Sequence, residues 1–502
     1  MTRGSGFSAP RPLILAWISS IALAALSIAG CGGGASGGTV TAPSGSTSVT
    51  LFTTGTANDK LLSFWAGLET LTLTSDDGKQ VDLLSSPVLP EFIHTNGTVE
   101  PYLTVSIPQG TYTSATATSG GVEAACDVLD SDGYEVDSNL FGNGVPGAVS
   151  VTLPAPITVS GESMGLLLDS LVSQSATVPG NCDIYGTFSV SPAFLLTPMS
   201  ISAQPTNSAN GKALGLRGMI ASIGADGAGF SVSRMYDQPV GQVVTWQVSA
   251  DSATAYQGVT GFSQLAVGMP VDMDVAFQAG GALLATRVAV YDTNTANLTE
   301  VDAHLLNTNL SLSLDGVTTP NLLDISSITA DGISEGSVPG HFPLWDYGGA
   351  VFQISGQLAN VSSLPFAATF SALNMVAGQH VLATTHETLG DTAIGYSSAT
   401  TITLIPQTIN GTVSAISTDG EFTTYTVALA PYDLFPQFAA LQNQVSALTD
   451  PSTVVVYADS NAQMLNTGPI AVGSVVRFYG LVFNDSGTLR MDCAQINDGV
   501  AE

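Results

Sequence analysis

Positively charged side chains are rare in this sequence. Its 502 residues contain ten Lys and Arg and five His against 40 Asp and Glu, giving a formal net charge of −30. Such a chain repels phosphate backbones and anionic surfaces, so nucleic acid is not an expected partner. Few His, Lys and Arg also leave few groups for general base catalysis or for stabilising an oxyanion. The H-E-x-x-H motif of zinc proteases and the P-loop of nucleotide-binding proteins are absent.

Long apolar runs are limited to one, near the N-terminus. Arg3 and Arg11 precede the uncharged run LILAWISSIALAALSI at 13–28, and small residues follow it. A basic start, an apolar middle and a small-residue exit are typical of an export signal. The run is short for a bilayer span, so a retained transmembrane anchor is the weaker alternative. We therefore expect residues 1–30 to be a signal peptide.

The residues at the end of the apolar run narrow this prediction. Ile28-Ala29-Gly30-Cys31 resembles the lipobox of bacterial lipoproteins. The resemblance implies that Cys31 carries a lipid that anchors the protein in a membrane; the alternative is an ordinary cleaved signal. Residues 31–48, rich in Gly, Ser and Thr, predict a flexible tether. Residue 32 is Gly and not Asp, the residue that resembles an inner-membrane retention signal, so the outer membrane of the cell envelope is the favoured location.

Cysteine is scarce as well, with four residues in the chain. An exported protein meets oxidising conditions, so we predict a disulfide between Cys126 and Cys182. Cys493 is then left over as a small buried residue, although other pairings stay open. None of the spacings resembles a zinc site.

The hydrophobic period is mostly two, which indicates β-strands. In VDMDVAF at 271–277 the apolar residues fall on one face, and Asp272 and Asp274 on the other. The segment 76–79, DDGK, predicts a hairpin turn. We expect an all-β fold, with an N-terminal β-sandwich followed by two or three small β-barrel-like modules. One exception is PQFAALQNQVSAL at 436–448, which predicts a short inserted helix.

The N-terminal module is expected at 49–200. It contains Pro108-Gln109-Gly110-Thr111-Tyr112, in which Gly permits a tight turn and Tyr returns to the core. This pattern resembles the turn of transthyretin-like and carboxypeptidase-regulatory-like β-sandwiches. The segment also resembles a bacterial lipoprotein module of unknown function.

The rest of the chain contains repeats. Each unit opens with Gly and aliphatic residues two and five positions later, and each has a second Gly with Val three residues after it. The second Gly is expected to make the turn into the next strand. The units resemble small OB-like β-barrel domains of unknown function, and we place them at 215–293, 305–408 (degenerate) and 409–500. Their opening and turn glycines are Gly218 and Gly268, Gly356 and Gly378, and Gly411 and Gly473.

One acidic segment, DVLDSDGYEVD at 127–137, is the best candidate for a metal site. Alternating carboxylates beside a turn glycine suit calcium, which takes six to eight oxygen ligands. The spacing does not meet the EF-hand pattern, so the alternative is a solvated acidic loop. No cofactor other than calcium is expected. The candidate ligands are Asp127, Asp130, Asp132, Glu135 and Asp137.

Two further segments carry weaker candidates. Trp345, Asp346 and Tyr347 could stack on a sugar ring and bond its hydroxyls, or form an aromatic plug over a small core. His380 and His386 lie six residues apart, too far along a strand to share a metal, so we expect two ordinary strand histidines.

These features favour binding over catalysis. We expect a lipid-anchored cell-envelope protein that binds or scaffolds a partner, with a carbohydrate or another envelope protein as the ligand. The alternative is an exported glycan hydrolase that uses a pair of carboxylates, since 40 acidic residues offer many pairs.

Overall fold

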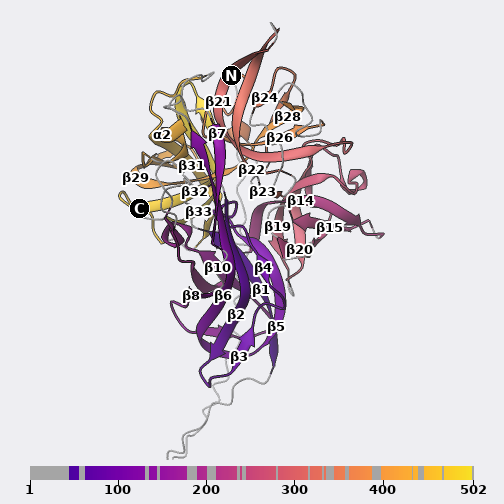
Figure 1. Cartoon of the computed structure of the whole chain (residues 1–502), viewed down its shortest axis with the longest axis vertical. Helices are drawn as coiled ribbons and strands as arrows, with labels where there is room; N and C mark the ends of the chain where they lie inside the picture. The colour runs from indigo at the N-terminus through magenta and orange to yellow at the C-terminus, as the bar shows by residue number, and fades with distance from the viewer. Residues whose placement is uncertain are drawn as a thin grey trace, which may run out of the picture. The chain divides into compact units, whose positions relative to one another are not determined.

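Figure 1 shows the computed structural model, with elements coloured along the chain. The structure describes residues 45–55, 61, 63–129, 135–143, 147–177, 189–199, 211–225, 227–234, 238–239, 245–278, 281–314, 317–330, 333–334, 344–356, 361–386, 397–431, 433–438, 446–465 and 468–499. These residues form an all-β fold with several sheets, as predicted. Two short α-helices accompany the strands in the described part.

The N-terminal part of the chain forms the N-terminal sheet, which has twelve strands among the described residues. Their order is β16-β4-β2-β6-β8-β13-β10-β1-β5, with β3 beside β2, and β7 and β9 beside β6. The helix α1 (Val172–Ser175) and the pair β11 (Ala176–Thr177) and β12 (Ser189–Val190) lie outside it. The strands of the sheet are β1 (Ser46–Gly55), β2 (Ser63–Ser75), β3 (Gln80–Asp82), β4 (Val88–Leu89), β5 (Glu100–Pro108), β6 (Gly110–Leu129), β7 (Glu135–Asn143), β8 (Gly147–Thr152), β9 (Ile157–Val159), β10 (Ser163–Ser170), β13 (Ala193–Met199) and β16 (Gln238–Pro239).

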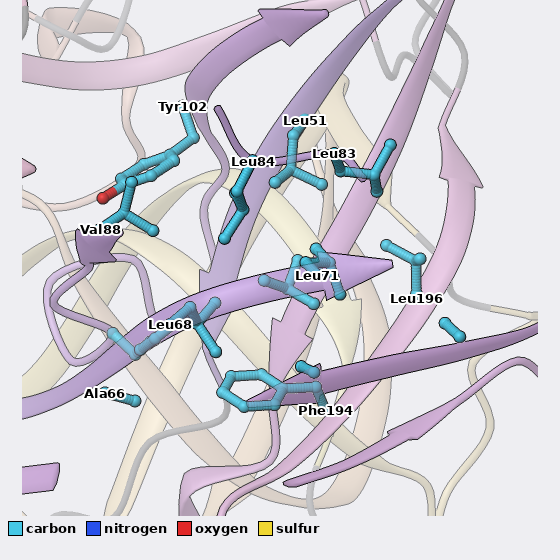
Figure 2. Packing of buried hydrophobic residues seen from close by; sticks show 14 of the residues in the cluster. Leu51, Ala66, Leu68, Leu71, Leu83, Leu84, Val88, Tyr102, Phe194 and Leu196 are labelled. Atoms are coloured by element: carbon cyan, nitrogen blue, oxygen red, sulfur yellow. The ribbon is translucent and has the colours of Figure 1, made fainter. Parts of the chain in front are cut away.

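Strands on both sides of β8 in the sheet order contribute to one apolar core. Leu51 of β1, Leu68 and Leu71 of β2, and Phe194 and Leu196 of β13 gather in it, as Figure 2 shows. All five side chains are at most 2% exposed. The predicted sandwich is thus realised as a continuous sheet joined through β8, which pairs with both β6 and β13.

The predicted turns of this sheet are confirmed in part. Gly78, with a φ of 82°, lies in the hairpin turn between β2 and β3. Tyr112 returns to the core and is 4% exposed, and its hydroxyl donates to the Pro108 carbonyl at 2.9 Å. Gly110 lies in β6 without a positive φ, and an added Cβ there would meet nothing within 4 Å. The backbone therefore does not require glycine at that position.

Three groups of strands follow, and we call them the first, second and third repeats. Their bounds are, for the first repeat, β14 (Lys212–Ile223), β15 (Gly229–Arg234), β17 (Thr245–Ser249), β18 (Ala255–Gln257), η1 (Phe262–Gln264), β19 (Pro270–Phe277) and β20 (Leu283–Ala289). For the second they are β21 (Thr299–Leu314), β22 (Val317–Ala330), β23 (Ile333–Ser334), β24 (Leu344–Asp346), β25 (Val351–Ile354), η4 (Val361–Ser363), β26 (His380–Thr385), β27 (Ser397–Ser398) and β28 (Thr401–Leu404). For the third they are β29 (Gln407–Asp419), β30 (Phe422–Ala428), β31 (Thr453–Leu465), β32 (Val475–Asp485) and β33 (Thr488–Asp498).

The three repeats share one strand order. The third is a closed barrel, β29-β30-β31-β33-β32. In the first, β17-β15-β14-β19-β20 has the same order and is closed by a parallel pairing of β17 with β20. In the second, the order is β24-β22-β21-β26-β28, and β27, two residues before β28, pairs in parallel with β24. Equivalent positions can therefore be compared among the repeats.

The turn glycines are confirmed as a shared feature. Gly268, Gly378 and Gly473 have φ values of 86°, 89° and 92°, which L-residues rarely adopt. Each donates its N–H to a residue of the first strand of its repeat, at 2.9, 2.8 and 2.8 Å. The acceptors are the carbonyls of Ile220, Leu305 and Val413, which are therefore equivalent positions.

The predicted opening of the middle repeat is wrong. The register places Ala303 of β21 at the position that Gly218 and Gly411 hold in the other two repeats. Gly356 instead follows β25, and its N–H donates to Gln257 Oε1 at 2.6 Å. The glycine-plus-aliphatic pattern at 356 therefore follows β25 and does not mark the first strand of the repeat, which is β21.

The predicted helix is also corrected. The helix α2 spans Leu434–Phe438, so it begins two residues before Pro436, and residues 446–448 are not helical. Residues 439–445 lie outside the described residues. Phe438 is buried, and Phe435 would meet a Cβ added at Gly378 at 2.8 Å. The helix therefore covers the turn of the second repeat.

Candidate functional site

Four charged side chains gather on the outer surface of the first repeat, and we call them the polar face. Arg287 of β20 donates from Nε to Asp274 Oδ2 and from Nη2 to Asp272 Oδ1, both at 2.8 Å. Arg217 of β14 lies opposite Asp272 in the ladder. All four residues are at most 6% exposed. The alternation at 271–277 correctly separated the aspartates from the apolar face, but did not show that their own face is covered.

The electrostatics of the polar face favour its charged forms. Burial opposes the ionised form of Asp272, yet the guanidinium groups of Arg287 and Arg217 outweigh it and lower its pKa. Burial likewise opposes the charge of Arg287, and the two aspartates overcome it and raise the pKa of that guanidinium. Burial raises the pKa of Tyr291, with Asp272 adding to the effect. Its hydroxyl therefore stays protonated and donates to Asp272 Oδ2 at 2.9 Å.

The polar face is covered by the second repeat. Arg217 pairs with Asp302 of β21, which also pairs with His380 Nε2. Asp302 holds the same register position in its repeat as Arg217 holds in the first, three residues before Leu305 and Ile220. The two repeats therefore meet through equivalent positions, and Asp302 is 1% exposed.

Two stacked histidines border this contact. The rings of His304 and His380 lie 4.6 Å apart at an interplanar angle of 21°. Burial, and after it the charge of His380, lowers the pKa of His304 to about 3. His304 is therefore neutral at physiological pH, and it does not compete with His380 for the carboxylate of Asp302.

The third repeat uses its equivalent face on the N-terminal sheet. Arg477 of β32 holds the position of Asp272, and its Nη1 donates to the Gly55 carbonyl at 2.9 Å. Gln495 of β33 donates to the carbonyl of Gly97, and Thr408 of β29 to the carbonyl of Asn96. This face is occupied in all three repeats, so a ligand must bind elsewhere on the repeats.

A second polar cluster lies where β5 of the N-terminal sheet begins. It consists of Glu91, His94 and Glu100, and we call it the His94 cluster. His94 Nδ1 lies 2.6 Å from Glu91 Oε2, and His94 Nε2 lies 2.6 Å from Glu100 Oε2. The imidazole is 9% exposed, and the two carboxylates are 0% and 5% exposed. Arg234 of the first repeat lies 3.8 Å from Glu100 Oε1. No sequence motif indicated this cluster.

Comparison with known families bears on the first repeat. The model of a domain of unknown function, DUF5666, matches residues 217–289. That range includes all four residues of the polar face. The remaining repeats carry the same strand order outside the matched range. No curated protein matches the chain.

Two of the five predicted calcium ligands fall outside the described residues. Asp130 and Asp132 are outside, and Cys31 and the tether up to residue 44 are too. Asp127 lies in β6, opposite Ser138, and Glu135 and Asp137 lie in β7, opposite Leu129 and Val128. The acidic segment is thus divided between two strands of a hairpin and their connection. The calcium site stays a prediction.

Only one cysteine of the predicted disulfide lies among the described residues. Cys126 is 2% exposed in β6, and Cys182 lies outside the described residues. The pairing stays a prediction. Cys493 is a free, buried thiol with 4% exposure, as expected, and burial raises its pKa, so it stays protonated.

The aromatic segment lies in the core of the second repeat. Trp345 is 1% exposed and Tyr347 is 7% exposed, and the Tyr347 hydroxyl donates to the Thr308 carbonyl at 3.1 Å. Asp346 accepts the N–H of Gly348 at 2.8 Å. The geometry agrees with an aromatic plug and leaves no exposed ring on which a sugar could stack.

His380 and His386 do not share a ligand. His386 Nε2 lies 2.9 Å from Asp292 Oδ2, whereas His380 pairs with Asp302. Within the described ranges, no group of three His, Cys, Asp or Glu side chains could hold a metal ion. In the same part of the chain, no helix has the length and hydropathy of a membrane span.

Sequence reasoning missed the residues that join the repeats to one another and to the N-terminal sheet. The signal available was the rarity of arginine, with five residues beyond the expected signal peptide. Four of these five are at most 6% exposed and hydrogen-bond acidic side chains or carbonyl groups. Arg217, Arg234 and Arg477 do so across to another unit, and Arg287 does so within the first repeat. In a chain with so few cations, each one is a candidate for such a structural role.

Proposed function

We propose that this chain is an exported, lipid-anchored protein of the bacterial cell envelope that binds or scaffolds a partner. The observation that carries the proposal is the use of the charged residues. The buried ion pair between Arg217 and Asp302 joins the first repeat to the second, and the pairs of Arg287 with Asp272 and Asp274 lie within the first repeat. Such buried pairs fix an arrangement without offering a reactive group to solvent. Joined β units present several loops in fixed relation, which suits a binding scaffold.

The proposed ligand is a carbohydrate or another envelope protein. A chain of net charge −30 avoids nucleic acid and anionic lipid surfaces. The loops remain as the binding region because the equivalent faces of the repeats are filled by neighbours. A glycan array and an envelope pull-down on the chain from Thr39 onward, run with and without calcium, test this proposal. Turnover of a glycan would contradict a purely binding role.

The proposed anchor is the lipid on Cys31, carried by the resemblance of residues 28–31 to a lipobox. Replacing Cys31 with Ala should move the protein from the membrane fraction to the soluble fraction. Mass spectrometry of the mature wild-type N-terminus should find acyl chains on the Cys31 sulfur. Tight membrane association of the Ala variant would count against the anchor.

One observation favours glycan hydrolysis as a second candidate function. Asp492 of β33 is half-buried, and burial, followed by the charge of Asp459 on β31, raises its pKa to about 7. The register places Asp492 opposite Tyr457, two residues before Asp459, so both carboxyls share the outer face of the third repeat. A carboxyl group that keeps its proton near neutral pH beside a second carboxyl group is the pattern of a glycosidase acid and its partner.

Replacing Asp492 with Asn separates this candidate from the binding role. A hydrolase would lose its glycan turnover, whereas a binding protein would keep its ligand. Because the folded-state pKa of Asp492 is raised, its contribution to stability is complete below the ordinary value of 3.8 and is lost as the pH rises to about 7. The Asn variant should therefore be more stable than wild type at pH 8. Absence of that gain would show that Asp492 is ionised without cost.

A further inference from the structure

The geometry of the His94 cluster requires one proton more than a neutral imidazole and two ionised carboxylates would hold. Both ring nitrogens of His94 face carboxylate oxygens at 2.6 Å. An ionised carboxylate only accepts hydrogen bonds, and a neutral imidazole has a single N–H to donate. With a neutral ring and two carboxylates, one of the two contacts would set lone pair against lone pair. The cluster must therefore bind an extra proton.

The surroundings place this proton on the imidazole. Glu91 accepts backbone N–H groups from Phe64 at 2.8 Å, from Ile93 at 2.9 Å and from His94 at 2.9 Å, so both of its oxygens already act as acceptors. Arg234 faces Glu100 from the first repeat. An imidazolium at His94 and the guanidinium of Arg234 are then opposite in charge to the carboxylates that they face. Loss of the proton would remove a positive charge from between two carboxylates in a site that is at most 9% exposed.

The same segment is where other parts of the chain attach. Trp246 Nε1 of the first repeat donates to the Pro101 carbonyl at 2.9 Å. Arg234 Nη1 donates to the Tyr102 carbonyl at 3.3 Å, and its guanidinium lies 4.3 Å from the centre of the Tyr102 ring.

The third repeat reaches this segment from the other direction. Arg477 Nη1 lies 3.4 Å from Asn96 Oδ1, and Gln495 donates to the carbonyl of Gly97. In the part of the chain that the structure describes, the charged and titratable groups that face His94 or its segment include Glu91, Glu100, Tyr102, Arg234 and Arg477.

We propose that the His94 cluster is a proton-loaded latch, which fixes the segment 91–102 so that the first and third repeats dock on it, and which opens as the pH rises. The latched form binds one more proton than the open form. Its stability is therefore complete at acidic pH and falls with increasing pH above the ordinary titration range of histidine. While this difference of one proton persists, the opening constant rises about tenfold per pH unit.

Two measurements on the full chain test the proposal. The first is the NMR spectrum of ¹⁵N-labelled histidine, which distinguishes an imidazolium from either neutral tautomer. The second is the hydrogen-exchange protection of the Trp246 indole N–H, which reports the docking of the first repeat. Protection is corrected for the intrinsic pH dependence of exchange, and the Trp246 signal is assigned with a Trp246→Phe variant.

The critical variant is Glu100→Gln. Its amide can donate to a neutral His94 and keep an oxygen toward Arg234, so the cluster no longer needs the extra proton. His386→Gln is the matched control, because His386 also lies between two oxygen acceptors, Ala296 O and Asp292 Oδ2, but away from the latch.

We expect His94 to be an imidazolium at pH 7.5 in wild type. Trp246 protection should fall about tenfold per pH unit above neutrality in wild type and in His386→Gln, and should not respond to pH in Glu100→Gln. A neutral His94 in wild type at pH 7, or the same pH response in wild type and Glu100→Gln, overturns the proposal. If Glu100→Gln does not fold, His94→Gln replaces it, and a wild-type pH response that persists there overturns the latch.

Discussion

Replacing Arg287 with Met should destabilise the first repeat strongly. Met keeps apolar atoms along the path of the side chain and removes the guanidinium, which makes hydrogen bonds of 2.8 Å to both Asp272 and Asp274. The aspartates are 2% and 6% exposed, so they cannot recover hydration without opening the repeat. Removing one partner of a buried ion pair costs about 3–5 kcal/mol. We expect the lower end, because the Tyr291 hydroxyl still donates to Asp272 at 2.9 Å.

The assay must resolve the first repeat from the others, since a chain of several units does not unfold in two states. Native-state hydrogen exchange of the β19 and β20 amides does this. A loss of about 3 kcal/mol lowers their protection by more than about a hundredfold. Unchanged protection would refute the view that Arg287 neutralises the two buried aspartates.

Arg490→Met is the matched control for Arg287→Met. Arg490 Nε donates to Asp485 Oδ2 at the same 2.8 Å, but the two side chains are 26% and 22% exposed. Ion pairs that solvent reaches contribute only about 0–1 kcal/mol, so we expect a smaller loss from breaking this half-buried pair. Adding Asp272→Asn and Asp274→Asn to Arg287→Met should restore most of the lost stability, because no buried charge then remains unpaired. Equal losses for Arg287→Met and Arg490→Met would contradict the argument from burial.

Two further predictions concern other parts of the repeats. His304 has a pKa of about 3 and binds no proton in the folded protein at mildly acidic pH, so its contribution to stability is lost as the pH falls from about 6.5 toward 3. In an acid titration, the stability of His304→Phe should therefore fall less steeply than that of wild type. Parallel stability curves would contradict this. Gly411→Ala should destabilise the third repeat more than Gly268→Ala does the first. A Cβ at 411 would lie 2.6 Å from the Ala428 carbonyl oxygen, whereas one at 268 meets nothing within 4 Å and costs only the strain of its φ of 86°, about 1 kcal/mol. Native-state hydrogen exchange of the amides in the first and third repeats checks the order, and a larger loss for Gly268→Ala would contradict it.

Local patterns in the sequence predicted local structure well. Gly268, Gly378 and Gly473 occupy the turns expected of them, because a positive φ leaves a clear preference for glycine. The alternation at 271–277 gave the correct inward face, since side-chain direction along a strand has a fixed period. Strand content and the presence of repeats followed from such signals.

Long-range partners were outside the reach of these patterns. Gly356 has the spacing of a repeat opener, but only the register of β21 with β26 reveals that Ala303 holds that position. Asp272 was assigned to a polar surface because alternation distinguishes two faces without saying what covers either. The His94 cluster brings together Glu91, which lies outside the named strands, Glu100 of β5 and an arginine of a later repeat.

The reuse of one face by every repeat limits how this chain could have grown by duplication. The first and second repeats cover each other through Arg217 and Asp302, and the third closes on the N-terminal sheet through Arg477. The equivalent face of each of the three described repeats is therefore covered, either by another repeat or by the N-terminal sheet. A fourth tandem copy would leave its equivalent face open to water, with no counterpart there to the ion pair that Arg217 and Asp302 form between the first two repeats.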